Sequence, residues 1–143
     1  MANEKEIFLS IKKLNKRFEL NFNSALAEYD LTSQQGMVLF FLNRQVHVNN
    51  RIIHQNDIEK EFNISKSTVS ALVDRLEKKQ FIEKKNNYPY AELYLTDKGK
   101  QLADLFRKNW LIYLDKLFTG LNEEEKIHLL EVLNKLNSNI KEE

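Results

Sequence analysis

Residues 55–82, QNDIEKEFNISKSTVSALVDRLEKKQFI, constrain the fold of this chain more than any other stretch. Apolar residues recur there three or four positions apart, which predicts one helix over residues 55–62 and another that begins after Ser65 as its N-cap. Asn63 tolerates the left-handed backbone that a tight turn between the two helices needs. Four apolar residues share the inner face of the second helix: Val69, Leu72, Val73 and Leu76. The layout is typical of a helix-turn-helix, whose second helix enters the major groove of DNA.

Helices are also expected before this motif, because glycine (3 residues) and proline (1 residue) are scarce and both interrupt helix interiors. Apolar spacing predicts a long amphipathic helix over residues 4–29. Thr32 and Gln35 have the spacing of a capping box, so a second helix is expected to start there and to end near Asn43.

Strands are expected in two places. Residues 44–54 are predicted to form a loop with a short β stretch at 51–53. Segments 81–85 and 91–95 alternate apolar and polar residues around a turn rich in Asn and Pro, which predicts a β-hairpin.

Two more helices are predicted after the hairpin. Thr96 caps the first, which is expected to reach about Phe118, with Gly120 as its stop. Asn122 and Glu125 open the second with another capping box. The predicted fold class is therefore mainly α (α+β), a winged helix-turn-helix with long helices at its N- and C-terminal ends.

Composition narrows the classes of function. The absence of cysteine excludes a disulfide frame, a thiolate metal site and a thiol redox switch. No run of about 18 apolar residues occurs and the charged N-terminus is not a signal peptide, so a cytoplasmic protein without a membrane partner is expected. The sequence has no Gly-rich phosphate loop or serine elbow, and its histidines lack the spacing of metal ligands. We therefore expect no enzyme activity, no cofactor and no metal site.

Charge is unevenly distributed along the chain, although the formal net charge is only +1. Residues 65–85 carry six Lys or Arg against three Asp or Glu, whereas residues 119–143 carry three Lys against six Glu. A basic middle and an acidic end fit a molecule with one DNA-facing side.

The helix after Ser65 carries short polar side chains on its outer face, so its backbone can approach base edges closely. Lys66, Arg75 and Lys78 are placed for phosphates or a guanine edge, and Ala71 for a thymine methyl group. The basic, amide-rich hairpin tip can follow the backbone or enter the minor groove. The residues predicted to bind DNA are Ser65, Lys66, Ser67, Thr68, Ser70, Ala71, Arg75, Lys78, Lys84, Lys85, Asn86 and Asn87.

Several motifs make this chain resemble the MarR family of bacterial transcription regulators, and the resemblance covers essentially its whole length. The motifs are Leu31-Thr32-x-x-Gln35, the run from Asn63 to Ser70, the run from Val73 to Lys79, and Leu95-Thr96-Asp97-Lys98-Gly99. The resemblance implies a homodimer that binds a pseudo-palindromic operator in double-stranded DNA, usually as a repressor, and is often released by a small aromatic or amphipathic effector. It also implies a single domain over residues 1–143, with dimerisation helices at 1–30 and 97–143 and a DNA-binding part at 31–96.

Two further sets of residues follow from this resemblance. The terminal helices have wide apolar stripes, which agrees with dimerisation. The candidates are Ile7, Phe8, Ile11, Leu14, Leu129, Leu133, Leu136 and Ile140. Ligands of the family lie between the DNA-binding part and the dimer helices. The weaker candidates for such a site, since aromatic residues at helical spacing are more often core, are Phe18, Phe22, Phe40 and Trp110.

The chain departs from the family pattern around the wing. Family wings commonly carry Asp-x-Arg near the tip and a glycine before the wing, and those places here hold Asn87, Pro89 and Gln80. Asp74 matches a family aspartate that often pairs with arginines, so its expected local partner is Arg75 or Lys78.

Two other functions remain open at this point. A winged-helix protein-interaction module, antirepressor-like and not reading DNA, would suit the near-zero net charge and the missing wing arginine. A replication or plasmid-maintenance initiator would use the same fold on repeated DNA sites.

Overall fold

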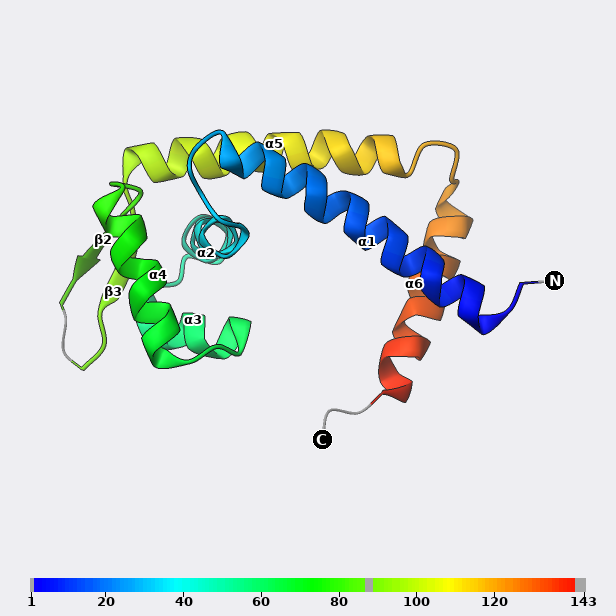
Figure 1. Cartoon of the computed structure of the whole chain (residues 1–143), viewed down its shortest axis with the longest axis horizontal. Coiled ribbons are helices and arrows are strands. Elements are labelled where there is room, and N and C mark those ends of the chain that lie inside the picture. The colour runs from blue at the N-terminus through cyan, green and yellow to red at the C-terminus, as the bar shows by residue number, and fades with distance from the viewer. Residues whose placement is uncertain (1, 87–88, 141–143) are drawn as a thin grey trace. The chain divides into compact units, whose positions relative to one another are not determined.

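The computed structural model describes residues 2–86 and 89–140 (Figure 1). The chain divides into two compact units, Met1–Leu105 and Phe106–Glu143, and helix α5 runs across the boundary. The elements in order are α1 (Glu4–Ala27), α2 (Ser33–Asn43), the π-helical turn η1 (Arg44–Val48), β1 (Ile53–His54), α3 (Gln55–Phe62), α4 (Lys66–Lys78), β2 (Ile82–Lys85), β3 (Glu92–Leu95), α5 (Asp97–Leu117) and α6 (Glu123–Asn139). This order confirms the predicted winged helix-turn-helix with long terminal helices.

The predicted helix starts are confirmed by their hydrogen bonds. Thr32 Oγ1 accepts the Gln35 amide at 3.3 Å while Gln35 Oε1 accepts the Thr32 amide at 3.0 Å. Thr96 Oγ1 accepts the amide of Gly99 at 3.0 Å, at the start of α5. Asn122 and Glu125 exchange the same reciprocal pair at the start of α6. Each bond satisfies an amide that the first helical turn leaves without a backbone partner.

The first unit also contains a three-stranded antiparallel sheet with the strand order β1-β3-β2. Leu93, in the central strand, pairs with Ile53 on one side and with Lys84 on the other. Leu93 and Ile53 are fully buried. The inner face of α4 is also buried as predicted, with exposed fractions of 0–4% for Val69, Leu72, Val73 and Leu76. The hairpin is thereby held beside α4 by the same core.

The prediction of a loop over residues 44–54 is wrong for the first half of this segment. Residues Arg44–Val48 continue beyond α2 as a π-helical turn, because nothing in RQVHV interrupts a helix. The Arg51 amide bonds to the Gln45 carbonyl at 3.0 Å and Asn50 has a φ of 51°, so the turn ends there. The β stretch lies at Ile53–His54 instead of 51–53, because those are the residues that pair with β3.

At three positions the backbone geometry restricts which residue types fit. Gly99 packs against the backbone of Phe81, the residue before β2. A Cβ atom at position 99 would lie 2.1 Å from the Phe81 carbonyl oxygen, so only glycine fits. Gln80 has a φ of 67°, in the left-handed region that suits the family's usual glycine. Asn63 has a φ of 50° and confirms the predicted left-handed turn between α3 and α4.

The second unit contains the rest of α5 and α6, joined through Gly120 at a φ of 91°. No residue of α6 is buried in the chain. Among the described residues, no helix is both long and apolar enough to cross a membrane.

Replacing Gln80 with glycine should raise the free energy of unfolding by about 0.5–1 kcal/mol. The left-handed conformation costs a non-glycine residue about 1–2 kcal/mol, and glycine at this position would avoid that cost. Part of this stabilisation is lost, because glycine has a larger conformational entropy in the unfolded chain. Urea unfolding at a fixed protein concentration measures the change. The control is Gln101→Gly, inside α5, which should lower the stability by about 1 kcal/mol. A lower stability for Gln80→Gly would contradict this account.

Candidate nucleic-acid interface

The first turn of α4 is organised around the hydroxyl of Ser65. Its oxygen accepts the Thr68 amide at 3.2 Å, which confirms Ser65 as the N-cap. The same oxygen lies 3.1 Å from the Ser67 hydroxyl and 2.8 Å from the Thr68 hydroxyl. Ser65, Ser67 and Thr68 are therefore brought together as one hydroxyl cluster at the beginning of the helix.

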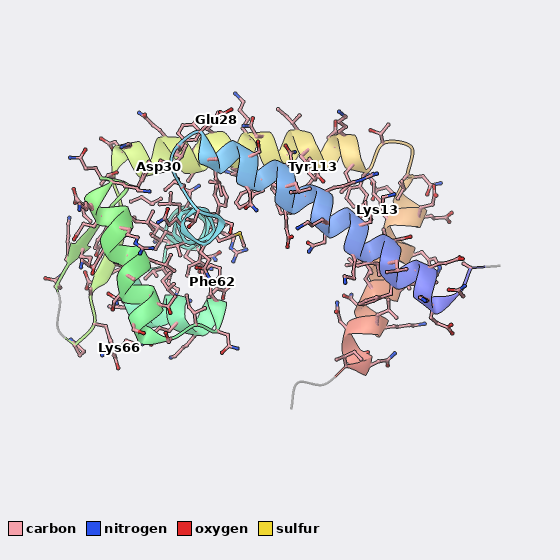
Figure 2. All side chains as sticks on the ribbon, in the orientation of Figure 1. Lys13, Glu28, Asp30, Phe62, Lys66 and Tyr113 are labelled. Atoms are coloured by element: carbon pink, nitrogen blue, oxygen red, sulfur yellow. The ribbon has the colours of Figure 1, made fainter. Side chains whose placement is uncertain are left out.

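The outer face of α4 is basic and sterically small. Within α4, the exposed residues among those predicted to bind DNA are Lys66, Ser67, Ala71, Arg75 and Lys78, and Figure 2 marks Lys66 at the first turn. Thr68 and Ser70 are half-buried at the edges of this face. Because the core holds the opposite face, α4 presents a protruding surface with short side chains near its N-terminal half and cations along its length.

Lys84, which was predicted to contact DNA, is held by two carboxylates of α4. Its Nζ donates to Asp74 Oδ1 at 2.6 Å and lies 3.7 Å from Glu77 Oε1. Its backbone amide donates to Glu77 Oε2 at 3.1 Å, and its side chain is only 25% exposed. The hydrogen bond to Asp74 is the main reason that the pKa of Lys84 is raised above 10.5. The Asp74–Lys84–Glu77 cluster thus ties strand β2 to α4.

The expectation that Asp74 pairs with Arg75 or Lys78 is wrong. The strand β2 runs back along α4, so a lysine ten positions further along the chain reaches Asp74. Spacing within one helix cannot reveal such a partner. An acidic side chain in α4 followed by a lysine in the first strand of the hairpin is the only sequence signal for it.

The described part of the wing tip is organised around Glu92. The carboxylate accepts the Tyr94 hydroxyl at 2.8 Å and the Asn86 amide at 3.1 Å, and these bonds, Tyr94 first, lower the pKa of Glu92. The Lys85 ammonium lies 5.0 Å from the centre of the Tyr94 ring. Lys85 and Asn86 are both exposed, and Asn87 lies outside the described residues.

A groove of about 310 Å³ lies between α3, the start of α4 and the hairpin. Its lining residues are Gln55, Glu59, Lys66, Lys84, Pro89, Tyr90 and Ala91. Gln55, the first residue of α3, was not predicted from the sequence as part of the interface. Its side chain bonds to Ser70, which is one of the predicted DNA-binding residues.

Three of the four aromatic candidates for a ligand site lie together in the first unit. The rings of Phe18 and Phe22 stack at 5.5 Å, and Phe22 meets Phe40 of α2 at 5.6 Å. Trp110 belongs to the second unit, where it stacks on Tyr113 at 5.8 Å. In the described part of the chain, no group of three or more His, Cys, Asp or Glu side chains is arranged to hold a metal ion.

The candidate dimerisation residues are mostly exposed in the single chain. In α1, Leu26 is the buried residue, whereas the predicted stripe of Ile7, Phe8, Ile11 and Leu14 is exposed. In the second unit, Leu129, Leu136 and Ile140 are exposed and Leu133 is half-buried.

The arrangement of α3, α4 and the β2–β3 hairpin defines a winged helix-turn-helix protein. The model of the MarR family matches residues 29–88, which span α2 to the tip of the hairpin. Residues 29–88 therefore match the MarR family of transcription regulators, as the sequence motifs had indicated.

Similar proteins extend this likeness over almost the whole chain. The HTH-type transcriptional regulator BilQ of Clostridioides difficile is 29% identical over 140 residues, which cover 93% of this chain and 90% of that protein. The transcription regulator MarR of Oenococcus oeni has a TM-score of 0.70 at 26% identity, with 92% of this chain and 98% of that chain covered. The Staphylococcus aureus MepR–DNA complex has a TM-score of 0.77 at 24% identity and 97% coverage of both chains, so it shares the fold.

The Asp74–Lys84 pair should contribute a coupling free energy of about 0.5–1 kcal/mol to stability, the range for a partly exposed pair. Asp74→Asn, Lys84→Met and the double variant, compared by urea unfolding, give that value as a double-mutant cycle. Because the pKa of Lys84 is raised above 10.5, the coupling should be complete at pH 7 and should disappear as the pH rises through the folded-state value. A parallel cycle on Asp74 and Lys85 serves as the control. A coupling near zero at pH 7 would show that the cluster does not tie the hairpin to α4.

Proposed function

We propose that this protein is a homodimeric repressor of its own or neighbouring genes. It binds a pseudo-palindromic operator with α4 in the major groove and the β2–β3 hairpin as the wing. The observation that carries the proposal is the face of α4, where exposed cations and short side chains stand opposite a fully buried apolar face. A helix fixed on one side by its core and free on the other can enter a groove about 12 Å wide.

Different parts of the interface have different roles in this proposal. Lys66, Arg75 and Lys78 contact phosphates or a guanine edge, and Ala71 lies against a thymine methyl group. Lys84 is removed from the set of direct contacts because Asp74 and Glu77 hold its ammonium. The wing contact is assigned to residues of the tip, namely Lys85, Asn86 and Asn87.

Dimerisation is supported by the exposed apolar stripes of the two terminal helices. A contiguous apolar surface of this kind on a soluble chain indicates an interface. We assign residues 1–30 and 97–143 to dimerisation and residues 31–96 to DNA binding. Twofold symmetry would then place the two copies of α4 about 34–36 Å apart, one turn of DNA, or a multiple of it. The DNA complex of MepR, a protein of the same fold, supports DNA as the partner.

A small aromatic or amphipathic effector is proposed to release the operator. The group of Phe18, Phe22 and Phe40 supplies an apolar surface of the kind such a molecule needs. MepR is described as the regulator of a multidrug efflux pump, which supports an effector of this class. The place of action is the cytoplasm, where the operator is.

The protein should bind DNA from upstream of its own gene with an affinity that falls as salt increases, since each phosphate contact releases counterions. Fluorescence anisotropy over a salt series measures the slope of log K against log[salt]. Lys85→Met should reduce the slope by about 1. Lys84→Met, the matched control in the same strand, should leave the slope unchanged, since its ammonium is held by Asp74. If Lys84→Met reduced the salt slope as much as Lys85→Met does, Lys84 would have to be counted among the residues that contact DNA.

A selection of random DNA sequences provides the broader test of the same proposal. Enrichment of a palindromic motif is the expected result, and enrichment of no motif would favour the protein-interaction module. Enrichment of tandemly repeated sites would favour a replication initiator.

Leu14→Glu should convert the dimer to a monomer, because it places a charge in the exposed apolar stripe of α1. Sedimentation velocity measures the molecular mass. The control is Lys16→Glu, on the opposite side of α1, which should leave the dimer intact. A Leu14→Glu protein that is still dimeric would exclude this stripe from the interface.

A further inference from the structure

Glu92 lies in the middle of a row of side chains that crosses the three-stranded sheet. In the strand register it pairs with His54 of β1 on one side and with Lys85 of β2 on the other. Paired residues of neighbouring antiparallel strands have their side chains on the same face of the sheet. Tyr94, two residues further along β3, shares that face, whereas the fully buried Leu93 belongs to the opposite one. The row therefore lies on the face of the sheet that is turned away from the core.

The carboxylate of Glu92 connects this row with the tip of the hairpin. One of its oxygens, Oε2, accepts both the Tyr94 hydroxyl at 2.8 Å and the side-chain amide of Asn86 at 3.1 Å. Asn86 follows the last residue of β2 and has a φ of 53°. The Tyr94 ring in turn lies 5.0 Å from the Lys85 ammonium. Glu92 therefore holds Asn86 directly and reaches Lys85 through Tyr94, and these two are the described residues to which the wing contact is assigned.

A carboxylate at this place has two opposing effects on the binding of DNA. Its negative charge repels phosphates. Its hydrogen bonds restrict the side chains of the tip before binding, so less conformational freedom is lost when the tip is ordered against DNA. Lys85 and Asn86 remain exposed while these contacts are made, whereas the side chain of Glu92 is only 21% exposed. The contacts thus leave both tip residues accessible to a partner.

Glu83 offers a comparison within the same hairpin. It lies in β2 opposite Tyr94 in the register, so it shares the face of Glu92, and it is exposed. Its carboxylate makes no hydrogen bond or ion pair with any residue that the structure describes. Glu83 therefore has the charge of Glu92 without its connections to the tip.

We propose that Glu92 is a positioning residue of the wing, which holds Lys85 and Asn86 in the conformation that contacts DNA. Its hydrogen bonds contribute more to operator affinity than its charge takes away. The inference rests on the proposed function, since it needs the β2–β3 hairpin to be the wing of a DNA-binding protein.

The direction of the change in operator affinity tests the inference. Glu92→Ala removes a negative charge and both hydrogen bonds, and it should weaken binding by about two- to tenfold, the range of one hydrogen bond. If repulsion of phosphates were the larger effect, the same variant would bind more tightly. Glu92→Gln removes the charge but keeps an amide oxygen that can accept both bonds, so its affinity should stay within about twofold of the unchanged protein. Fluorescence anisotropy with an operator obtained by DNA selection measures these affinities.

Glu83→Ala is the matched control, because it removes the same charge from the same face of the hairpin and no connection to the tip. It should bind the operator as tightly as the unchanged protein or more tightly. In a background of Asn86→Ala with Tyr94→Phe neither hydrogen bond to Glu92 can form, so Glu92→Ala should no longer weaken binding there. Backbone ¹⁵N relaxation of the protein without DNA should show lower order parameters at residues 85 and 86 in Glu92→Ala and unchanged ones in Glu83→Ala.

The outcomes separate this inference from the proposed function. Unchanged or tighter operator binding by Glu92→Ala would overturn the positioning role and leave the DNA-binding regulator standing. Failure of the unchanged protein to bind any selected operator would overturn the regulator itself. Thermal unfolding shows whether Glu92→Ala keeps the fold. Tyr94→Phe, which removes one of the two bonds and keeps the ring beside Lys85, is the milder second variant and should weaken binding by a smaller factor.

Discussion

The burial of one face of α4 is the constraint on which the rest of the structure depends. Val69, Leu72, Val73 and Leu76 lie in the core, so the rotation of the helix about its own axis is determined. That rotation decides which residues face outward, and it brings Asp74 and Glu77 to the side where the hairpin passes. The attachment of the wing and the composition of the proposed DNA-binding surface are both consequences of the same apolar contacts.

The number of charges available to a partner on the proposed interface is smaller than the number in its sequence, because some of these charges pair with one another. Three of the charges between residues 65 and 85, those of Asp74, Glu77 and Lys84, are used within the protein to connect α4 with β2. The cations left on the outer face are Lys66, Arg75 and Lys78, with Lys85 on the wing. The family's wing arginine is absent from this chain. In the described part of the tip, the side chains of Asn86 and Tyr94 donate hydrogen bonds to the Glu92 carboxylate.

The features that could be predicted from the sequence are those governed by neighbours along the chain. Capping boxes at Thr32 and Asn122 and the period of apolar residues in α4 each depend on a few consecutive positions. The π-helical turn after α2 could not be predicted, because RQVHV is compatible with a loop and with continued helix. The partners of Asp74 and Ser70 also could not, since they depend on the register of one element against another. Contacts of that kind are a property of the packed structure, even where each residue had been singled out beforehand.

The absence of any buried residue in α6 has a consequence for how the folded protein responds to its own abundance. In the proposed dimer, a helix that fully buries no residue within its own chain would gain much of its stability from the second copy. Folding of the second unit and association of the proposed dimer are then linked by mass action, so the apparent melting temperature rises with protein concentration. In the proposed dimer, dilution would therefore separate the two copies of α4, and binding to a paired site would depend on the number of molecules in the cell.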